Sequence, residues 1–426
     1  MTIKSKNAAA LAIGALLLTG CSEPAPTQTT GTTGAGAATD QLEVFSYWTS
    51  GSEEASLNVL FDAYKKLYPN VDIANAAISG GGGANADQVL QSRIAGGNPP
   101  DTWQTMPGAV MATFVEQGLA ADLTDIFESE RIGAVMPQEL LDLMSADGKV
   151  YTIVAGNHRQ NTLWYNKSVL AEAGVTIGDS LSWEQFTDAL AKVEASGVTP
   201  FCNGDKDIFA AVGVAEVAIL AKAGIQNAAT LAKGEGWDTQ AVREGVADYL
   251  TILENTNDDH SALTWDEAVK RMADGGCGFN MMADSAYGEL LNYGAVDGDT
   301  FGYVDYPGTA GAYVILSDSF VVSATATNAE NARNWVKLLG DPAVQTAFSA
   351  KKGTIPARTD ADTSTLGTYL QWAAAKYKTD TIIPTMCYGM AIGPVAKQGF
   401  YDAITQLNQD KNADNFIAAM QVALTS

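Results

Sequence analysis

The stretch Val44-Phe45-Ser46-Tyr47-Trp48-Thr49-Ser50-Gly51-Ser52-Glu53 indicates the fold class of this chain. Its first residues are β-formers that predict a short strand, and the small polar residues from Thr49 to Ser52 end that strand. An amphipathic helix follows, with apolar residues at helical spacing from Leu57 to Leu67. A strand that leads directly into a helix is the repeating unit of an α/β sheet. The stretch therefore predicts an α/β protein.

The turn between this strand and this helix is a candidate ligand site. Ligands of open α/β sheets bind at the edge where strands end and helices begin. Tyr47 and Trp48 offer flat apolar faces there, and Glu53 offers a hydrogen-bond acceptor, a combination that suits a sugar ring. The alternative is that both aromatic residues belong to the core and cap the sheet.

The length and composition indicate a folded protein with two lobes. The chain has 426 residues, of which 46% are hydrophobic and 17% are charged, and single cores stop growing beyond about 250–300 residues. The net charge is −24. This charge argues against nucleic-acid binding, because there is no basic surface to neutralise phosphates. It also argues against a surface that lies flat on anionic lipid.

The N-terminus predicts a lipoprotein signal peptide over residues 1–20. The apolar run Ala8–Leu18 follows two lysines and is too short to span a bilayer. Leu18-Thr19-Gly20-Cys21 resembles a bacterial lipobox, in which Cys21 is lipidated, and residues 21–40 predict a flexible tether. We therefore expect a protein held by lipid on the outer face of the cytoplasmic membrane, extracellular or periplasmic. The alternative is a plain secretory signal with a chance cysteine.

Three further cysteines follow Cys21, and an oxidising compartment permits a disulfide between two of them. Cys202 and Cys277 each adjoin a short apolar run, so the two runs could be neighbouring strands joined by a bridge. Cys387 is then left over. The alternative is that all three are small buried hydrophobic residues.

The sequence indicates no metal site, no cofactor and no catalytic triad. The two histidines, His158 and His260, lie far apart in the sequence without the spacing of zinc ligands. The glycine loop Ser79–Asn85 lacks the ending of a phosphate-binding loop, so we expect its backbone to turn sharply or to approach a ligand. There is no Gly-x-Ser-x-Gly elbow, and no carboxylate pair stands out as a glycosidase dyad.

A set of aromatic and polar residues at predicted strand ends has the composition of a carbohydrate site. Aromatic rings pack against sugar C–H faces, while acids, amides and lysine bind the hydroxyl groups. His158 is a further candidate, with a structural hydrogen-bonding role as its alternative. The candidate substrate-binding residues are Tyr47, Trp48, Glu53, Gln104, His158, Trp265, Asp284, Asp318, Lys352 and Tyr388.

Several short motifs, spread over nearly all of the chain after Leu42, carry a resemblance to a known family. They are Val44-Phe45-Ser46-Tyr47-Trp48, Gly97-Asn98-Pro99-Pro100-Asp101, Trp164-Tyr165-Asn166-Lys167, Trp265-Asp266-Glu267-Ala268-Val269, Phe279-Asn280-Met281-Met282 and Ser317-Asp318-Ser319-Phe320. With them the chain resembles bacterial extracellular solute-binding proteins, the binding components of ABC importers, and is most similar to their glucose/mannose-binding branch.

The resemblance implies an α/β fold of the type II periplasmic-binding-protein kind. Each lobe would be a mostly parallel sheet flanked by helices, and the lobes would close on a ligand cleft like a hinge. The implied N-terminal lobe is 41–160 plus 322–352, and the implied C-terminal lobe is 161–321 plus 353–426. The resemblance also implies binding without catalysis, because the partner permease consumes the ATP.

Carried over residue by residue, the resemblance assigns sugar contacts to Tyr47, Trp48, Glu53, Gln104, Trp265, Asp318 and Lys352. The sugar would stack on Trp48 and Trp265. The chain departs from the branch at Met106 and Tyr388, where histidines are expected, and at Ser285, where an aromatic residue is expected. These departures leave the identity of the sugar open.

The sequence therefore predicts a monomeric, lipid-anchored carbohydrate-binding protein that captures a mono- or small oligosaccharide, glucose-like, and delivers it to an ABC transporter permease. One alternative is a binding protein for a glucoside, an osmolyte or another non-sugar solute. Another is an envelope enzyme that processes glycosides.

Overall fold

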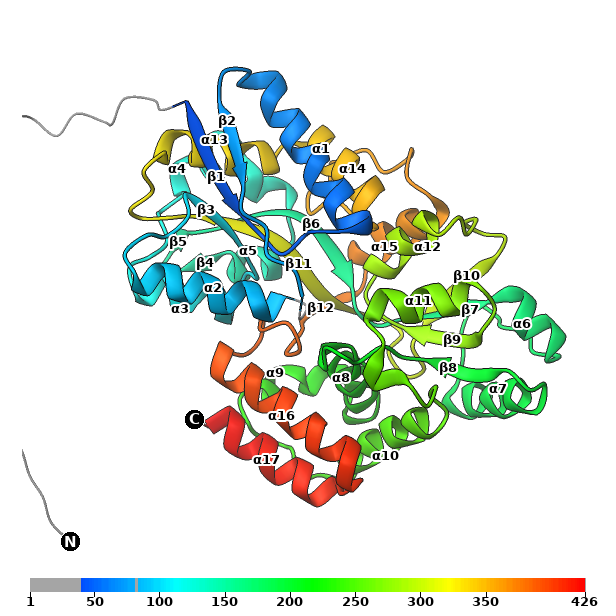
Figure 1. Cartoon of the computed structure of the whole chain (residues 1–426). Helices are drawn as coiled ribbons and strands as arrows, with labels where there is room; N and C mark the ends of the chain where they lie inside the picture. The colour runs from blue at the N-terminus through cyan, green and yellow to red at the C-terminus, as the bar shows by residue number, and fades with distance from the viewer. Residues whose placement is uncertain (1–39, 81–82, 426) are drawn as a thin grey trace, which may run out of the picture. The chain divides into compact units, whose positions relative to one another are not determined.

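The computed structural model describes residues 40–80 and 83–425 (Figure 1). The predicted signal peptide, Cys21 and the tether up to residue 39 lie outside the described residues. Two main sheets and one short hairpin, β4 (Ser145–Ala146) with β5 (Lys149–Val150), contain all the strands of the described part.

The larger sheet has six strands in the order β12-β11-β3-β1-β2, with β6 paired to β11. β1 is parallel to β2 and β3, and β11 is parallel to β12 but antiparallel to β3 and β6. The strands are β1 (Gln41–Phe45), β2 (Asp72–Asn75), β3 (Thr102–Thr105), β6 (Ile153–Arg159), β11 (Ala312–Val322) and β12 (Thr381–Pro384).

The smaller sheet has four strands in the order β10-β7-β9-β8. They are β7 (Thr162–Asn166), β8 (Thr199–Cys202), β9 (Cys277–Met281) and β10 (Phe301–Asp305). β8 is parallel to β9, while β7 is antiparallel to both β9 and β10. The prediction of mostly parallel sheets thus fits the larger sheet better than the smaller one, because β7 enters the smaller sheet directly from β6, and β10 leaves it directly to β11, without a crossover helix.

Helices separate most of the strands along the chain. Between β1 and β6 lie α1 (Gly51–Leu67), α2 (Ala84–Ala95), α3 (Ala109–Glu116), α4 (Thr124–Ser129), η2 (Ile132–Val135) and α5 (Gln138–Leu143). Between β7 and β9 lie α6 (Lys167–Glu172), α7 (Trp183–Ala195), α8 (Phe209–Ala223), η3 (Ile225–Asn227), α9 (Ala228–Ala232), α10 (Gln240–Glu254), η4 (His260–Ala262) and α11 (Trp265–Ala273).

The remaining helices follow β9. They are α12 (Ser285–Asn292), α13 (Ala329–Leu339), α14 (Pro342–Lys352), α15 (Thr368–Tyr377), α16 (Pro394–Asp410) and α17 (Ala413–Thr425). In the described part of the chain, no single helix has the length and hydropathy needed to cross a membrane. α8 and the segment Ile225–Ala232 meet those criteria only together, and they are bent by 109°.

Two helices begin at capping boxes, which the sequence predicts from Ser182 with Gln185 three residues on and from Thr264 with Glu267 three residues on. In α7, the Ser182 side chain accepts a hydrogen bond from the Gln185 N–H, and the Gln185 side chain accepts one from the Ser182 N–H. Thr264 and Glu267 form the same reciprocal capping box at the start of α11. Such pairs satisfy amide groups that have no partner within the helix. The second box places Trp265 at the first position of its helix.

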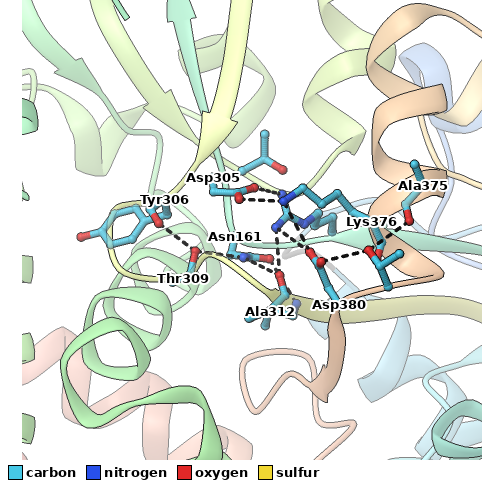
Figure 2. A network of polar contacts seen from close by, with 12 residues as sticks. Asn161, Asp305, Tyr306, Thr309, Ala312, Ala375, Lys376 and Asp380 are labelled. Atoms are coloured by element: carbon cyan, nitrogen blue, oxygen red, sulfur yellow. Dashed lines mark hydrogen bonds and ion pairs between the residues drawn. The ribbon is translucent and has the colours of Figure 1, made fainter. Parts of the chain in front are cut away.

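The chain passes between the two sheets at several points that lie close together. β6 of the larger sheet continues through Gln160 and Asn161 into β7 of the smaller sheet, and β10 returns through residues 306–311 to β11. Figure 2 shows Asn161, Thr309 and Ala312 bonded at these passages. Asn161 Nδ2 donates to Thr309 Oγ1 and to the Ala312 carbonyl, both at 3.0 Å.

The sheets do not follow the lobe boundaries expected from the resemblance. β11 begins at Ala312 and β12 covers 381–384, and both belong to the larger sheet, which contains β1. The expected boundaries had assigned 312–321 and 381–384 to the other lobe. β11 and β12 pair with each other in parallel from Ala312 onward, so the passage into the larger sheet comes about ten residues earlier than the sequence motifs indicated. The exact division of the chain into lobes stays a prediction.

Candidate functional site

A cavity of about 200 Å³ is lined by residues from strands of the larger sheet, from loops that follow strands of both sheets and from helix ends. The loop after β1 contributes Tyr47, β11 contributes Asp318, and the loop after β9 contributes Met282. The full lining is Tyr47, Thr49, Ser50, Glu53, Ser79, Gly80, Gly83, His158, Asp207, Phe209, Thr264, Trp265, Asp266, Met282, Ser285, Leu316, Asp318, Lys352 and Tyr388.

Seven of the ten predicted substrate-binding residues line this cavity. They are Tyr47, Glu53, His158, Trp265, Asp318, Lys352 and Tyr388. The glycine loop also reaches it through Gly80 and Gly83, as expected for a backbone that comes close to a ligand. Gly83 has a φ of 102°, and a Cβ there would lie 3.1 Å from the Tyr47 ring, so a larger residue would push against that ring.

Glu53 is placed on the cavity by the first turn of α1. The N-cap residue Ser50 makes no side-chain cap. Instead, Ser52 donates from its backbone N–H and its hydroxyl to Glu289 Oε1 of α12, at 2.8 and 2.7 Å. A carboxylate is favourable at a helix N-terminus, where amide groups point outward without partners. Glu289 therefore fixes the end of α1 from an element more than 200 residues away.

Four charged residues form what we call the cavity cluster: Glu53, His158, Asp318 and Lys352. Lys352 Nζ lies 2.5 Å from Glu53 Oε1, and His158 Nε2 lies 3.0 Å from Asp318 Oδ2. Lys352, His158 and Asp318 are almost fully buried, whereas the Glu53 side chain is 20% exposed. Each acid thus has a basic partner, which is the usual condition for charges held away from water.

The pKa values of the cavity cluster follow from burial and from this pairing. Burial lowers the pKa of His158, but Asp318 and Asp284 outweigh it and raise the pKa to about 9. Burial raises the pKa of Asp318, yet Lys352 and His158 outweigh it and hold the pKa below its ordinary value. For Glu53, burial prevails over Lys352 and raises the pKa. His158 is therefore a cation at neutral pH.

Trp48 does not line the cavity, so the prediction that a sugar stacks on it is corrected. Its side chain is fully buried and packs against Phe320 and Phe348, with ring centroids at 5.8 and 5.5 Å. Lys352 Nζ lies 4.8 Å from the centre of the Trp48 ring. A cation held over an indole face is attracted by it. Trp48 therefore holds Lys352 in place through its ring face. Trp48 belongs to the core, as the alternative interpretation of the sequence had it, whereas Tyr47 lines the cavity.

Gln104 and Asp284 also lie behind the cavity lining. Gln104 Nε2 donates to Asp318 Oδ1 at 3.4 Å, and its Oε1 accepts from the Tyr47 N–H at the same distance. Asp284 is fully buried, accepts a short hydrogen bond from the Arg159 N–H, and has an oxygen 3.6 Å from His158 Nδ1. Both residues hold a cavity residue in place, and neither lines the cavity itself.

The three positions that depart from the glucose/mannose-binding pattern have different locations. Ser285 and Tyr388 line the cavity, so their side chains bear on which ligand fits. Met106 is buried in the core and does not line it. Tyr47, Trp265 and Tyr388 are all partly exposed, which leaves ring surface available to a ligand.

Sequence reasoning missed several lining residues, among them Asp207 and Asp266. Asp207 follows β8 by five residues, so the rule that ligands bind at strand ends could have found it. Asp266 stands inside the capping box of α11 and in one of the motifs that carry the resemblance, but it was not assigned to the ligand site. Thr49 and Ser50 were interpreted only as strand-breaking residues, yet both line the cavity.

The described part of the chain contains one disulfide and one free cysteine. Cys202 and Cys277 form a disulfide with their Cα atoms 5.7 Å apart, which is the pairing that the sequence allowed, and Cys387 is free and buried. Within residues 40–80 and 83–425, no group of three or more His, Cys, Asp or Glu side chains is arranged to hold a metal ion.

A family model matches residues 59–385, which is most of the chain. Its description is "Bacterial extracellular solute-binding protein". The motifs that carried the resemblance lie mainly inside this range, and the match confirms the resemblance.

Two relatives match over nearly their whole length. A "Probable sugar-binding periplasmic protein" of Brucella melitensis is 30% identical over 90% of this chain and 91% of its own. An ABC transporter extracellular-binding protein of Pyrococcus horikoshii is 29% identical over 88% of this chain and 85% of its own.

Solved structures share the fold. One of them, a chitin oligosaccharide binding protein, aligns with a TM-score of 0.79 over 90% of this chain and 98% of its own, at 18% identity. The expected two-lobe α/β fold of type II is confirmed by this alignment.

Proposed function

The chain belongs to the family of bacterial extracellular solute-binding proteins, and from that premise we propose that it captures a mono- or small oligosaccharide and delivers it to the permease of an ABC importer. The family and the relatives are binding proteins rather than enzymes. The alternative of a glycoside-processing enzyme is therefore set aside.

The observation that carries the proposal is the mixture of groups around the cavity. Tyr47, Trp265 and Tyr388 supply partly exposed rings, and the cavity cluster supplies charged donors and acceptors beside them. Sugars need both, because their C–H faces pack on rings while their hydroxyl groups donate and accept hydrogen bonds. The sugar-binding names of relatives support the same ligand class.

The residues of the cavity take separate roles in this proposal. Trp265 and Tyr47 contact the sugar faces, and Tyr388 and Ser285, which line the same cavity, limit which sugar fits. Glu53, Asp318, Lys352 and His158 bind hydroxyl groups. Trp48, Gln104 and Asp284, which lie behind the lining, hold Lys352, Asp318 and His158 in position.

A glucose-like monosaccharide is the first candidate ligand. The cavity volume of about 200 Å³ lies below the range of about 300–1,000 Å³ that is usual for small-molecule sites. This volume favours one or two sugar rings over a longer oligosaccharide. The negatively charged side chains Asp207 and Asp266, added to the paired charges of the cavity cluster, disfavour sugar acids and sugar phosphates.

Titration calorimetry tests the ligand class. The panel contains glucose, mannose, galactose, xylose, a β-glucoside, maltose, a uronic acid and glycine betaine. We expect at least one neutral sugar to bind with micromolar affinity, about −8 kcal/mol, and the uronic acid not to bind. If no sugar of the panel binds, or if betaine alone binds, the sugar assignment is wrong.

We further propose that the mature protein is a monomer attached to the membrane by lipid on Cys21. The support is the lipobox-like stretch Leu18–Cys21 and the polar segment after it. Expression in a bacterial host and detergent phase separation test the anchor. The native protein should enter the detergent phase, whereas Cys21→Ala should stay in the aqueous phase. Light scattering of the soluble form tests the monomer.

A further inference from the structure

A short loop carries Tyr388 to the cavity. Residues 385–390 follow β12 and precede α16. Thr385, Met386 and Cys387 are buried, and Tyr388 lines the cavity. The position of the Tyr388 ring is thus set by how the backbone just before it is held.

Neighbouring elements hold this loop by its backbone on two sides. The N–H groups of Ala109 and Val110, at the start of α3, donate to the carbonyls of Met390 and Gly389 at 2.9 and 3.1 Å. The Tyr401 hydroxyl, on α16, donates to the Cys387 carbonyl at 3.0 Å. These bonds use carbonyl groups of the loop. The N–H groups of Met386 and Cys387 need a different partner.

That partner is the carboxylate of Glu216. Its Oε1 accepts from the Met386 N–H at 2.6 Å and its Oε2 accepts from the Cys387 N–H at 3.1 Å. Glu216 lies in the middle of α8, whose residues from Phe209 to Leu220 are all buried, and its own exposure is 1%. Among the described residues it forms no ion pair.

A carboxylate without a basic partner is costly to bury, so its position requires an explanation. The cavity cluster contains acids too, but each has a basic residue beside it. In the described part of the chain, the Glu216 carboxylate is bonded by the two backbone amides alone. Two convergent N–H donors bound to one charged group fix a backbone more rigidly than a neutral side chain would.

We propose that Glu216 is a positioning residue of the ligand site, which fixes the backbone at Met386 and Cys387 and thereby sets where Tyr388 stands in the cavity. The part of this proposal that concerns the loop rests on contacts between protein atoms alone and does not depend on the ligand. The consequence for affinity rests on the proposed sugar-binding function.

Among the titratable groups of the loop and of the helices packed on α8, Glu216 is the one whose charge changes near neutral pH. The Cys387 thiol and the Tyr388 phenol of the loop interact electrostatically with Glu216. On α16, which packs on α8, stand the Tyr401 phenol and the Lys397 ammonium, and on α10, also packed on α8, stand the Tyr249 phenol and Asp248, which is paired with Lys222. Burial raises the pKa values of the thiol and of the three phenols well above neutrality. Burial also raises the pKa of Glu216 to about 7, against the opposing effect of the two amides.

Protonation of Glu216 converts one acceptor oxygen into a hydroxyl donor. The loop should therefore be held by two strong hydrogen bonds above about pH 7 and less firmly below it. Glu216→Gln makes a similar change permanently, because it replaces one acceptor oxygen with an amide donor of the same size.

Hydrogen–deuterium exchange of the peptide that covers residues 385–391 tests the positioning directly and needs no ligand. After correction for the intrinsic pH dependence of exchange, Glu216→Gln should raise the exchange rate about tenfold, as loss of one charged hydrogen bond predicts. The wild type should approach the variant as pH falls from about 8 to 6. Glu194→Gln, on the exposed face of α7, is the matched control and should change nothing.

Calorimetry with the tightest sugar of the panel provides the second readout. Glu216→Gln should weaken binding about tenfold in the native background and have no further effect in a Tyr388→Ala background. Unchanged exchange in Glu216→Gln, or an affinity loss that persists without Tyr388, would overturn the proposal. If no sugar binds, the exchange result still decides on Glu216, while the sugar-binding function fails separately.

Discussion

Two neighbouring residues of β6, His158 and Arg159, belong to two different groups of charged side chains. His158 belongs to the cavity cluster, and Arg159, the next residue, belongs to what we call the crossing cluster, together with Asp305, Lys376 and Asp380. Successive side chains of a strand point to opposite faces. One strand therefore supplies the ligand cavity from one face and the passages between the two sheets from the other.

The charged side chains of the crossing cluster pair with one another around Arg159. Arg159 is fully buried; its Nη1 lies 2.7 Å from Asp305 Oδ1, and its Nη2 donates to the Ala312 carbonyl at 2.8 Å. Its guanidinium carbon lies 4.7 Å from the centre of the Trp372 ring. Figure 2 shows Asp305, Lys376 and Asp380 converging on this place, where Lys376 Nζ lies 3.1 Å from Asp305.

The cavity cluster is left incomplete toward the cavity. An ammonium group has three donors, and the one ion pair of Lys352 among the described residues is with Glu53. Glu53 keeps a fifth of its side-chain surface exposed. The comparison teaches that charged side chains serve stability where they pair with one another around a buried guanidinium, and serve binding where their free donors and acceptors line a cavity.

The largest expected effect comes from breaking the crossing cluster. Arg159→Met leaves Asp305 and Asp380 without the guanidinium, and loss of one partner of a buried ion pair costs about 3–5 kcal/mol. Urea unfolding measures this change in the free energy of unfolding. Arg243→Met is the matched control, since Arg243 pairs with Asp238 and Asp414 at the surface, where about 0–1 kcal/mol is expected. Equal effects of the two variants would contradict the distinction.

Trp48 and Trp265 should respond differently to substitution, because Trp48 is buried behind the cavity whereas Trp265 lines it. Trp48→Ala removes a fully buried ring and should cost about 3–5 kcal/mol of stability. Trp265→Ala removes a partly exposed ring of the cavity wall and should leave stability nearly unchanged, while the sugar affinity falls by about 1–3 kcal/mol. Urea unfolding and calorimetry on both variants check this. A stable Trp48→Ala protein that has lost binding would restore the stacking role to Trp48.

The protonation of His158 should make the free energy of unfolding depend on pH. Its folded-state pKa is about 9, against an ordinary value of 6.5, so the folded state holds the proton more tightly than the unfolded state. Its contribution is fully present below about pH 6.5 and is lost as pH rises through about 9.

The free energy of unfolding should therefore fall between about pH 7 and 9.5, by up to about 3 kcal/mol. His158→Gln should flatten this part of the profile. Unfolding curves at closely spaced pH values provide the measurement, and an unchanged slope in the variant would show that His158 is neutral in the folded protein.

The smallest expected effect is at Glu53. Glu53→Gln keeps the shape of the side chain and removes its charge, so Lys352 loses a carboxylate and a ligand hydroxyl loses a charged acceptor. Affinity for the bound sugar should fall by about 1–2 kcal/mol. Glu54→Gln, the exposed neighbour in α1, is the control. Indistinguishable calorimetry for the two variants would remove Glu53 from the site.

Much of the candidate site could be predicted because its residues stand at strand ends, which local patterns reveal. Tyr47, Glu53 and Trp265 are each placed by a strand-to-helix turn or by a capping box. The choice between Tyr47 and Trp48 could not be made in the same way. It depends on Phe320 and Phe348, nearly 300 residues away, which pack against the Trp48 ring and leave Tyr47 facing the cavity.

The sequence by itself determined the α/β class, the start of α7 and the neighbourhood of the ligand site, because strand ends, caps and helical periodicity act over a few residues. Only the tertiary structure decided that β11 and β12 join the larger sheet, that Glu289 caps α1, and that Glu216 holds the loop before Tyr388. Those pairings join residues from 69 to 237 positions apart in the sequence. They form only once the folded chain has brought the partners together and excluded water from between them.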